Sequence, residues 1–208
     1  MKNMHTGETL LKGESRKCPA YFFRWLVVEL APTIHGYKPA TLLSLSDSFS
    51  FPRLSFWQQY GPGFLRRSGI EWVVLRECAR KRVILFYRPQ LLEEWLKKGE
   101  NCRFLAAHGY KPECSLSENM AYLKKRYQGE CPHEIGLWLG IPLKDVLGFM
   151  GISKEYCSCK GLWCIYGDPE LSLTLMRKIN DSKRVVAEIL QNGVNPHNIL
   201  LGYYEQTA

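Results

Sequence analysis

The stretch Pro132–Gly151, PHEIGLWLGIPLKDVLGFMG, most constrains the fold of this chain, because it sets glycines at helical spacing among apolar residues. Pro132 and Glu134 suit a first helical turn, since proline there loses no hydrogen bond and the helix dipole favours a carboxylate. Gly140 is placed to end this helix before a second one begins. A glycine inside a helix, such as Gly136, costs about 1 kcal/mol relative to alanine. We therefore expect two short helices that offset this cost by packing tightly on a neighbouring element.

The length and composition indicate one globular domain. The chain has 208 residues, of which 46% are apolar and 23% are charged, and a chain of this size buries roughly 70% of its unfolded surface. We expect a polar leader at residues 1–19, a single domain at 20–192 and a C-terminal tail at 193–208. No apolar run approaches the roughly 20 residues of a membrane span. The eight cysteines lack a preceding secretion signal, which indicates reduced thiols in a cytoplasmic protein.

Apolar periodicity and turn residues predict the order of elements. We expect helices at residues 21–31, 54–60, 89–98, 101–109, 117–128, 169–180 and 182–191, and strands at 41–46, 70–77, 83–87 and 161–166. A buried strand is the alternative for residues 21–31. Pro32 is expected to stop the first helix, and Gly61-Pro62-Gly63 to interrupt the second. The fold class is α+β, with a small, mainly antiparallel sheet, helices on one face and a helical insertion. A ferredoxin-like β-α-β-β-α-β sheet is one arrangement that fits this order.

A polar loop at residues 31–40 (APTIHGYKPA) is the first candidate site. Loops held by rigid elements often carry function, although this one could also be an ordered connection with exposed side chains. We expect it to lie beside the start of the helix at His133 and to form a cleft for a small anionic ligand, because helix N-termini and cations favour anions. The ligand-binding candidates are Thr33, His35, Lys38, Tyr87, Arg88 and His133. The protein would then be a binding or regulatory module.

The second hypothesis is an enzyme that uses His133 or His35 as a general base, with Glu134 or Tyr87 nearby. His133 and Glu134 are adjacent, so on a helix they point about 100° apart and do not form the i, i+4 pair of a metal site. The alternative is structural: a histidine bonded to the backbone at a helix start, beside a glutamate that matches the dipole. The catalytic residues therefore stay open among these candidates.

The sequence contains no established cofactor or metal motif. Cys157, Cys159 and Cys164 are spaced more tightly than the ligand pairs of structural zinc sites, and Cys131 lies far upstream. We interpret these cysteines as ordinary thiols and predict no metal. The GxG at residues 61–63 is too short for a dinucleotide loop, and no phosphate-binding loop motif is present.

Nucleic-acid binding is the third hypothesis, because the formal net charge is +8. The basic residues form short clusters spread along the chain, at residues 16–17, 66–67, 80–82, 97–98, 124–126 and 183–184. Such clusters can meet a polyanion, but they are more typical of solvated helix and turn faces. No motif of a nucleic-acid-binding fold accompanies them, and nothing in the sequence indicates the oligomeric state.

Four segments resemble the bacterial domain-of-unknown-function family 3793: APTIHGYKPA at 31–40, VILFYRP at 83–89, PHEIGLWLGIPLKDVLGF at 132–149 and GLWCIYGD at 161–168. The resemblance extends over about residues 20–190. It implies a small cytosolic bacterial protein and no established activity. Many members carry His-Cys just before the APT, where this chain has Glu29 and Leu30. Thiol or metal chemistry at those two positions is therefore not expected here.

Overall fold

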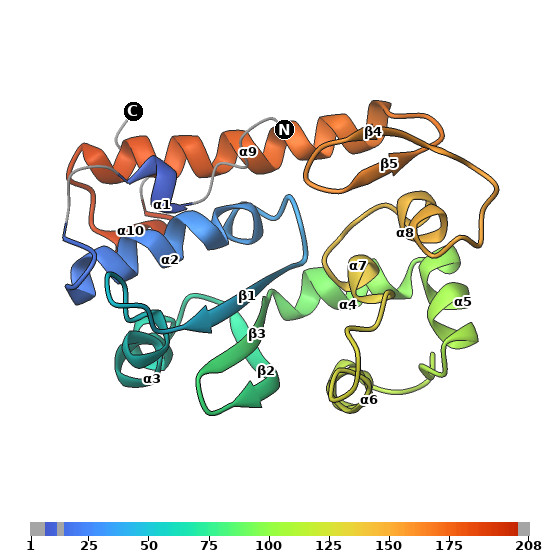
Figure 1. Cartoon of the computed structure of the whole chain (residues 1–208), viewed down its shortest axis with the longest axis horizontal. Coiled ribbons are helices and arrows are strands. Elements are labelled where there is room, and N and C mark those ends of the chain that lie inside the picture. Colours follow the sequence, from blue (N-terminus) through green and yellow to red (C-terminus); the bar gives the residue numbers. More distant parts are fainter. Residues whose placement is uncertain (1–6, 12–14, 204–208) are drawn as a thin grey trace.

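A small antiparallel sheet lies between two groups of helices in the computed structural model, which describes residues 7–11 and 15–203 (Figure 1). The strands are β1 (Ala40–Ser46), β2 (Glu71–Cys78) and β3 (Lys81–Tyr87), in the order β1-β3-β2. The central strand β3 is antiparallel to both neighbours. The predicted hairpin and the predicted strand before it are therefore confirmed, as is the α+β class.

Both faces of this sheet are buried, because alternate side chains of β3 enter different cores. Ile84 and Phe86 belong to one core, and Leu85 belongs to the other. The first core is formed with helices α1 (Gly7–Leu10), α2 (Pro19–Ile34), α3 (Arg53–Phe64), α9 (Glu170–Gln191) and α10 (Pro196–Leu200). The second is formed with α4 (Pro89–Lys97), α5 (Gly99–Ala107), α6 (Leu116–Arg126), α7 (Ile135–Trp138) and α8 (Leu143–Phe149). The expectation of helices on only one face was wrong.

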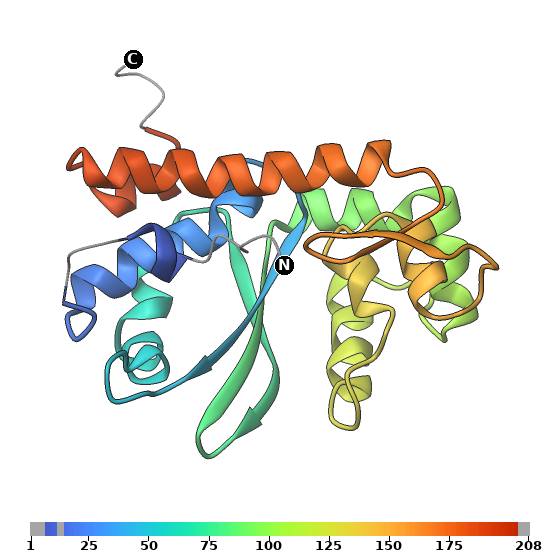
Figure 2. The same ribbon diagram turned by 45° about the horizontal axis from the view of Figure 1, so that its top comes forward.

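The last predicted strand does not join the main sheet. It is the short strand β5 (Cys164–Tyr166), which pairs with β4 (Cys157–Lys160) in a separate two-stranded sheet. This hairpin packs on α8, and it lies at one end of α9 in both ribbon views (Figures 1 and 2). A ferredoxin-like sheet needs its fourth strand in the main sheet, so that arrangement is excluded. The reason is that side-chain contacts with α8 hold β5 away from the main sheet.

Two prolines expected to end helices lie inside them. Helix α2 continues through Pro32 to Ile34, because a proline in the last turn removes only one helical hydrogen bond. The Pro32 carbonyl then accepts hydrogen bonds from the N–H groups of Tyr37 (2.9 Å) and Lys38 (3.3 Å). Helix α3 runs through residues 61–63, where a Cβ on Gly61 would lie 2.1 Å from the Trp57 ring. The loop predicted at 31–40 is accordingly shorter, at residues 35–39.

The two helices predicted near the C-terminus are one continuous helix, α9, of 22 residues. One buried stripe follows its whole length and includes Met176, Ile179, Val186 and Leu190. Val186 and Leu190 belong to the first core together with α2, and a Cβ on Gly161 would lie 2.5 Å from Met176, so tertiary contacts on both sides of Asn180 and Asp181 carry the helix through them. The stretch expected as a tail contains α10, with Ile199 fully buried.

The expected leader at 1–19 also contains described structure. It includes helix α1 and the buried residue Leu11. The described residues do not include positions 1–6 and 12–14 of that leader, nor the final positions 204–208.

The glycines of the central stretch make the close approaches that their spacing predicted. A Cβ added to Gly136 would lie 3.2 Å from Val146 of α8, and one on Gly148 would lie 2.1 Å from the Tyr166 ring. Gly140 has φ +80°, and a Cβ there would lie 2.5 Å from the Pro39 side chain. The α7–α8 pair is therefore held tightly between the hairpin β4–β5 and the turn that leads into β1.

Candidate functional site

Two clefts meet at Lys38, in the turn between α2 and β1. We call the larger one the lysine cleft; its volume is about 700 Å³ and its lining includes Lys38, Lys98, Lys144 and Lys178. We call the other the Glu29 cleft; its volume is about 430 Å³ and its lining includes Glu29, Lys38, Thr41, Arg53, Trp163 and Lys183. Gly140 also lines both clefts. Lys38 is therefore the charged side chain that the two clefts share.

The backbone around Lys38 is held by contacts from both sides of the turn. The Arg88 guanidinium donates to the Ile34 carbonyl at 2.8 Å, and the Arg88 N–H donates to the Pro39 carbonyl at 3.1 Å. On the other side Gly140 fits directly against Pro39. Because any side chain at position 140 would push on this turn, the glycine fixes where Lys38 sits.

The carboxylate of Glu29 in this cleft is already neutralised. The Glu29 carboxylate accepts hydrogen bonds from the Lys183 ammonium at 2.5 Å and from the Gly7 N–H at 2.7 Å. The hydroxyls of Thr33 and Thr41 share a hydrogen bond of 2.7 Å in the same region. Within the described part of the chain the side-chain ammonium of Lys38 has neither a hydrogen bond nor an ion pair. Its amine is thus free to meet a group that enters either cleft.

The environment lowers the pKa of Lys38 from 10.5 to about 8. Burial of the ammonium group is the largest cause, and the neighbouring Lys183 cation adds to it. The Glu29 carboxylate partly offsets both effects, because its negative charge favours the protonated amine. At neutral pH a minor fraction of the Lys38 side chain is therefore present as the neutral amine.

The other lysines of the lysine cleft are held by aromatic and polar neighbours. The Lys178 ammonium lies 5.9 Å from the centre of the Tyr37 ring, and the Lys98 ammonium lies 4.8 Å from the centre of the Trp95 ring. Lys144 donates to the Tyr166 carbonyl at 2.8 Å. Four lysines line this cleft, against two acidic residues, Glu94 and Glu100. The lining therefore has an excess of positive charge.

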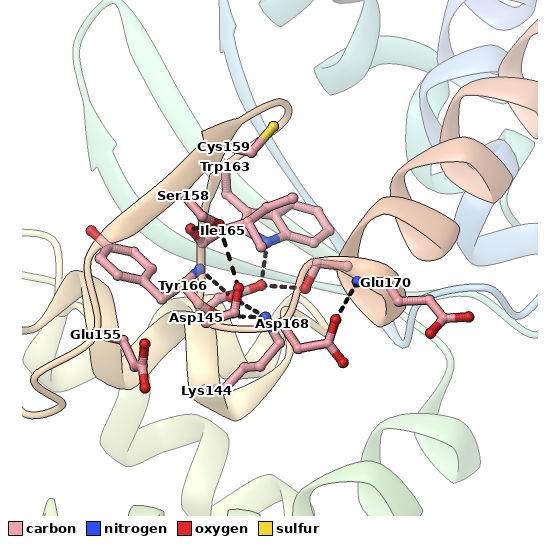
Figure 3. Close-up of polar contacts among 12 residues, drawn as sticks. Lys144, Asp145, Glu155, Ser158, Cys159, Trp163, Ile165, Tyr166, Asp168 and Glu170 are labelled. Carbon is pink, nitrogen blue, oxygen red and sulfur yellow. Dashed lines mark hydrogen bonds and ion pairs between the residues drawn. The ribbon is translucent and has the colours of Figure 1, made fainter.

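Asp145 anchors the hairpin that borders the Glu29 cleft (Figure 3). Its buried carboxylate accepts hydrogen bonds from the Lys144 ammonium at 2.7 Å, the Trp163 indole at 2.8 Å, the Tyr166 N–H at 2.9 Å and the Ser172 hydroxyl at 2.5 Å. Burial would raise the pKa of this carboxyl, but these donors outweigh it and the pKa is lowered. Asp145 thus joins α8, β5 and α9 and positions Trp163 in the wall of the cleft.

His133 and Glu134 do not line either cleft. His133 is exposed, and its ring lies edge-on to Phe149 with 5.3 Å between ring centres. Glu134 is buried, where it accepts hydrogen bonds from the Arg126 guanidinium and, at 3.2 Å, from the Tyr110 hydroxyl. Burial alone would raise the pKa of Glu134, but the hydrogen bond from Arg126 outweighs burial, so the pKa is lowered. The loop thus meets the trailing end of α7 at Gly140, whereas the prediction placed it beside the leading end.

The remaining predicted residues have separate positions. Thr33 lies in α2 and is fully buried, and the His35 ring lies edge-on to Tyr37, with 5.7 Å between ring centres. The Tyr87 hydroxyl donates to Glu71 at 2.9 Å. Burial, with added effects from that hydrogen bond and from the Glu71 charge, raises the pKa of Tyr87 to about 12. Lys38 is therefore the one ligand-binding candidate that lines both clefts, with Arg88 supporting its backbone.

The cysteines are all free thiols. Cys157, Cys159 and Cys164 lie on the hairpin β4–β5, while the Cys131 thiol donates to the Tyr127 hydroxyl at 3.3 Å. Across residues 7–11 and 15–203, no three histidine, cysteine or acidic side chains are grouped as a metal ion would need.

Sequence reasoning missed Glu29, Lys144, Lys178 and Lys183 as parts of the site. A usable signal existed for Glu29, because it is the one acidic residue in the apolar helix segment YFFRWLVVELAPTI. A buried carboxylate needs a cation, so its presence predicts a lysine or arginine brought from elsewhere. Nothing local marks Lys183 as that partner, since it lies 154 positions further along the chain.

The fold and the clefts define an α+β protein with a three-stranded sheet covered on both faces and a lysine at the junction of two clefts. The chain belongs to the family described as "Protein of unknown function (DUF3793)", whose sequence profile matches residues 26–200. Neither the curated proteins nor the solved structures contain a match to the chain. No helix in the described segments has the length and apolar character needed to cross a bilayer.

Proposed function

We propose that this protein is a small binding or regulatory module that holds an anionic ligand in the lysine cleft. The observation that carries the proposal is the gathering of Lys38, Lys98, Lys144 and Lys178 around one hollow of about 700 Å³. These lysines come from four separate segments of the chain, so only the folded protein brings them together. A ligand with a carboxylate or phosphate group would find several ammonium donors there.

The aromatic rings of the cleft support the same proposal. Tyr37 and Trp95 lie beneath the ammonium groups of Lys178 and Lys98 and limit their freedom. The apolar side chains of Leu91, Leu143 and Leu175 complete the lining. This mixture suits a small organic anion with an apolar body better than a bare inorganic ion.

The other two hypotheses lack a comparable observation. Acid–base chemistry at His133 and Glu134 would have to use a carboxylate that Arg126 and Tyr110 already occupy. Several of the basic residues considered for nucleic-acid binding are paired with acidic neighbours, including Arg82 with Glu77 and Arg184 with Glu188. A cytoplasmic location is in keeping with eight unpaired thiols.

The test is a binding titration of the full chain with inorganic phosphate and with succinate. Binding is monitored by changes in the amide NMR shifts and by calorimetry. Lys178→Gln and Lys98→Gln should each weaken binding about two- to fivefold, the range that corresponds to about 0.5–1 kcal/mol for an exposed charge pair. Lys125→Gln is the matched control, because this exposed lysine lies on α6, outside both clefts. Saturable binding that is equally weakened by all three substitutions would contradict the proposal, as would no binding.

A further inference from the structure

We propose that Lys38 is a nucleophile that forms an imine with the aldehyde or ketone group of an anionic ligand. The inference rests on the proposed function, because the lysine cleft would supply the attraction for the anionic part of that ligand. It goes beyond that function by assigning one amine as the atom that reacts. The position of Lys38 at the junction of the two clefts, without a partner among the described residues, carries the argument.

The arrangement of charges around Lys38 is the one that a reactive lysine needs. Lys183 and Glu29 are paired with each other at 2.5 Å, so the carboxylate next to Lys38 is engaged elsewhere. Lys38 is left half-buried beside a second cation. A lysine becomes a good nucleophile when it is desolvated or lies next to another cationic group, and Lys38 has both features. Its lowered pKa has these same two causes.

The proposed step balances without an oxidant or a metal. The neutral Lys38 amine attacks the carbonyl carbon of the ligand: a C–N bond forms as the C=O π bond breaks, and one proton passes from the nitrogen to the former carbonyl oxygen. The resulting carbinolamine then loses this hydroxyl group and the remaining N–H proton as one water molecule. The product is an imine that links the ligand carbon to the Lys38 nitrogen.

The reactive fraction of Lys38 can be compared with that of an ordinary lysine. A pKa of about 8 in place of 10.5 makes the neutral fraction at pH 7 about 300-fold larger. A less basic nucleophile also attacks more slowly, so that about half of this advantage remains on a logarithmic scale if amines follow the trend known for thiols. We therefore expect Lys38 to react roughly 20-fold faster than an exposed lysine at neutral pH.

The experiment is reductive trapping on the full chain. The protein is incubated with glyoxylate and sodium cyanoborohydride at pH 7, and the modified lysines are located and timed by peptide mass spectrometry. Lys38 should be labelled roughly 20-fold faster than Lys125, the exposed lysine on α6. Lys38→Arg and Lys38→Met should remove only this fast phase. Labelling of Lys38 no faster than that of Lys125 in the wild-type chain would overturn the proposal, and this comparison needs no variant.

The pH profile separates reactivity from mere accessibility. The charged groups that line the two clefts around Lys38 come from several elements: Glu8, Glu29, Arg53, Glu94, Lys98, Glu100, Lys144, Lys178 and Lys183. The labelling rate at Lys38 should reach half of its maximum near pH 8 and level off above it, and Lys183→Gln should move this midpoint upward. A midpoint close to that of Lys125 would count against the inference.

Phosphate binding distinguishes this inference from the proposed function, because phosphate has no carbonyl group. Phosphate bound in the lysine cleft together with slow Lys38 labelling would refute the imine alone. Fast Lys38 labelling without binding of either phosphate or succinate would refute the anion cleft and leave Lys38 as a reactive amine.

Discussion

Gly140 lies against Pro39 so closely that a Cβ built on the glycine would be 2.5 Å from the Pro39 Cδ. The same glycine has φ +80°, a backbone conformation that side chains with a Cβ rarely adopt. This contact joins the α7–α8 turn to the residues that carry Lys38. It links the most distinctive motif of the sequence to the junction of the two clefts.

Replacing Gly140 should therefore harm both stability and the site. Gly140→Ala is expected to lower the free energy of unfolding by about 2 kcal/mol, from left-handed strain together with the clash against Pro39. Gly63→Ala is the control, since it lies inside helix α3 with nothing within 4 Å of its added Cβ. It should be neutral or stabilise by up to about 1 kcal/mol. Chemical denaturation measures both, and equal effects would contradict this account of Gly140.

Asp145 should be among the more sensitive carboxylates of the protein. Asp145→Asn keeps the shape but removes the charge that four donors share, and the amide leaves at least one buried donor without an acceptor. We expect a loss of about 2 kcal/mol in the free energy of unfolding. Asp181→Asn, at an exposed position on α9, should change it by less than about 0.5 kcal/mol. If both substitutions cost the same, the network in Figure 3 would not be the source of the effect.

The contribution of Asp145 should also depend on pH in a defined direction. Its pKa is lower in the folded protein than the ordinary value of 3.8, so the unfolded chain binds its proton first as the pH falls. The stabilisation is thus complete above pH 3.8 and decreases as the pH falls below it. The difference in unfolding free energy between the wild type and Asp145→Asn should be constant from pH 5 to 7 and smaller at pH 3. A difference that grew in acid would reverse the assigned sign.

Glu134 and His133 should respond differently to substitution, although they are adjacent. Glu134→Gln weakens the contacts with Arg126 and Tyr110 inside the second core, and we expect a loss of about 2 kcal/mol in unfolding free energy. His133→Ala removes an exposed ring that lies edge-on to the exposed Phe149, so the expected loss is below about 0.5 kcal/mol. Thermal unfolding of the two variants checks this contrast. A large effect at His133 would show that its ring has a structural role.

The pKa of Lys38 is directly measurable. Titration of the lysine side chains by NMR should show Lys38 with a midpoint of about 8 in the wild-type chain. Removing the neighbouring cation in Lys183→Gln should raise this pKa, and removing the carboxylate in Glu29→Gln should lower it. Because the folded protein binds the Lys38 proton less tightly than the unfolded chain, stability should rise with pH between about 8 and 10.5. Lys38→Met should lack that rise.

Local patterns predicted much of the fold, because short-range physics decides those parts. The hairpin at β2–β3 follows from two apolar, β-branched runs and a tight turn, and it is present. The glycines at 136, 140 and 148 predicted close packing, and each one makes it. The stops expected at Pro32 and Pro62 failed, because a helix tolerates proline when packing over its buried residues outweighs one lost hydrogen bond.

The candidate site was predicted less well, because its parts lie far apart in the sequence. Lys38 was named from its loop, but the partner of the nearby Glu29 is Lys183, from the other end of the chain. The first turn of α8 contributes Lys144 to the lysine cleft, whereas His133, which was expected in the site, lies outside both clefts. The Lys183–Glu29 pair joins residues that are 154 positions apart, so no spacing within a short segment could have predicted it.

The amino-acid sequence alone determined that this is an α+β protein with a tight, glycine-spaced helix pair and a basic, polar turn after its first long helix. These features depend on side-chain size, apolar periodicity and backbone freedom, which act within a few residues. Only the tertiary structure decided that helices cover both faces of the sheet and that β5 stays in its own hairpin. It also decided that the Lys38 ammonium, beside the Lys183–Glu29 pair, has no partner of its own among the residues that the structure describes. Burial and charge compensation depend on which distant segments pack together. That packing depends on interactions across the whole chain and not on any single local pattern.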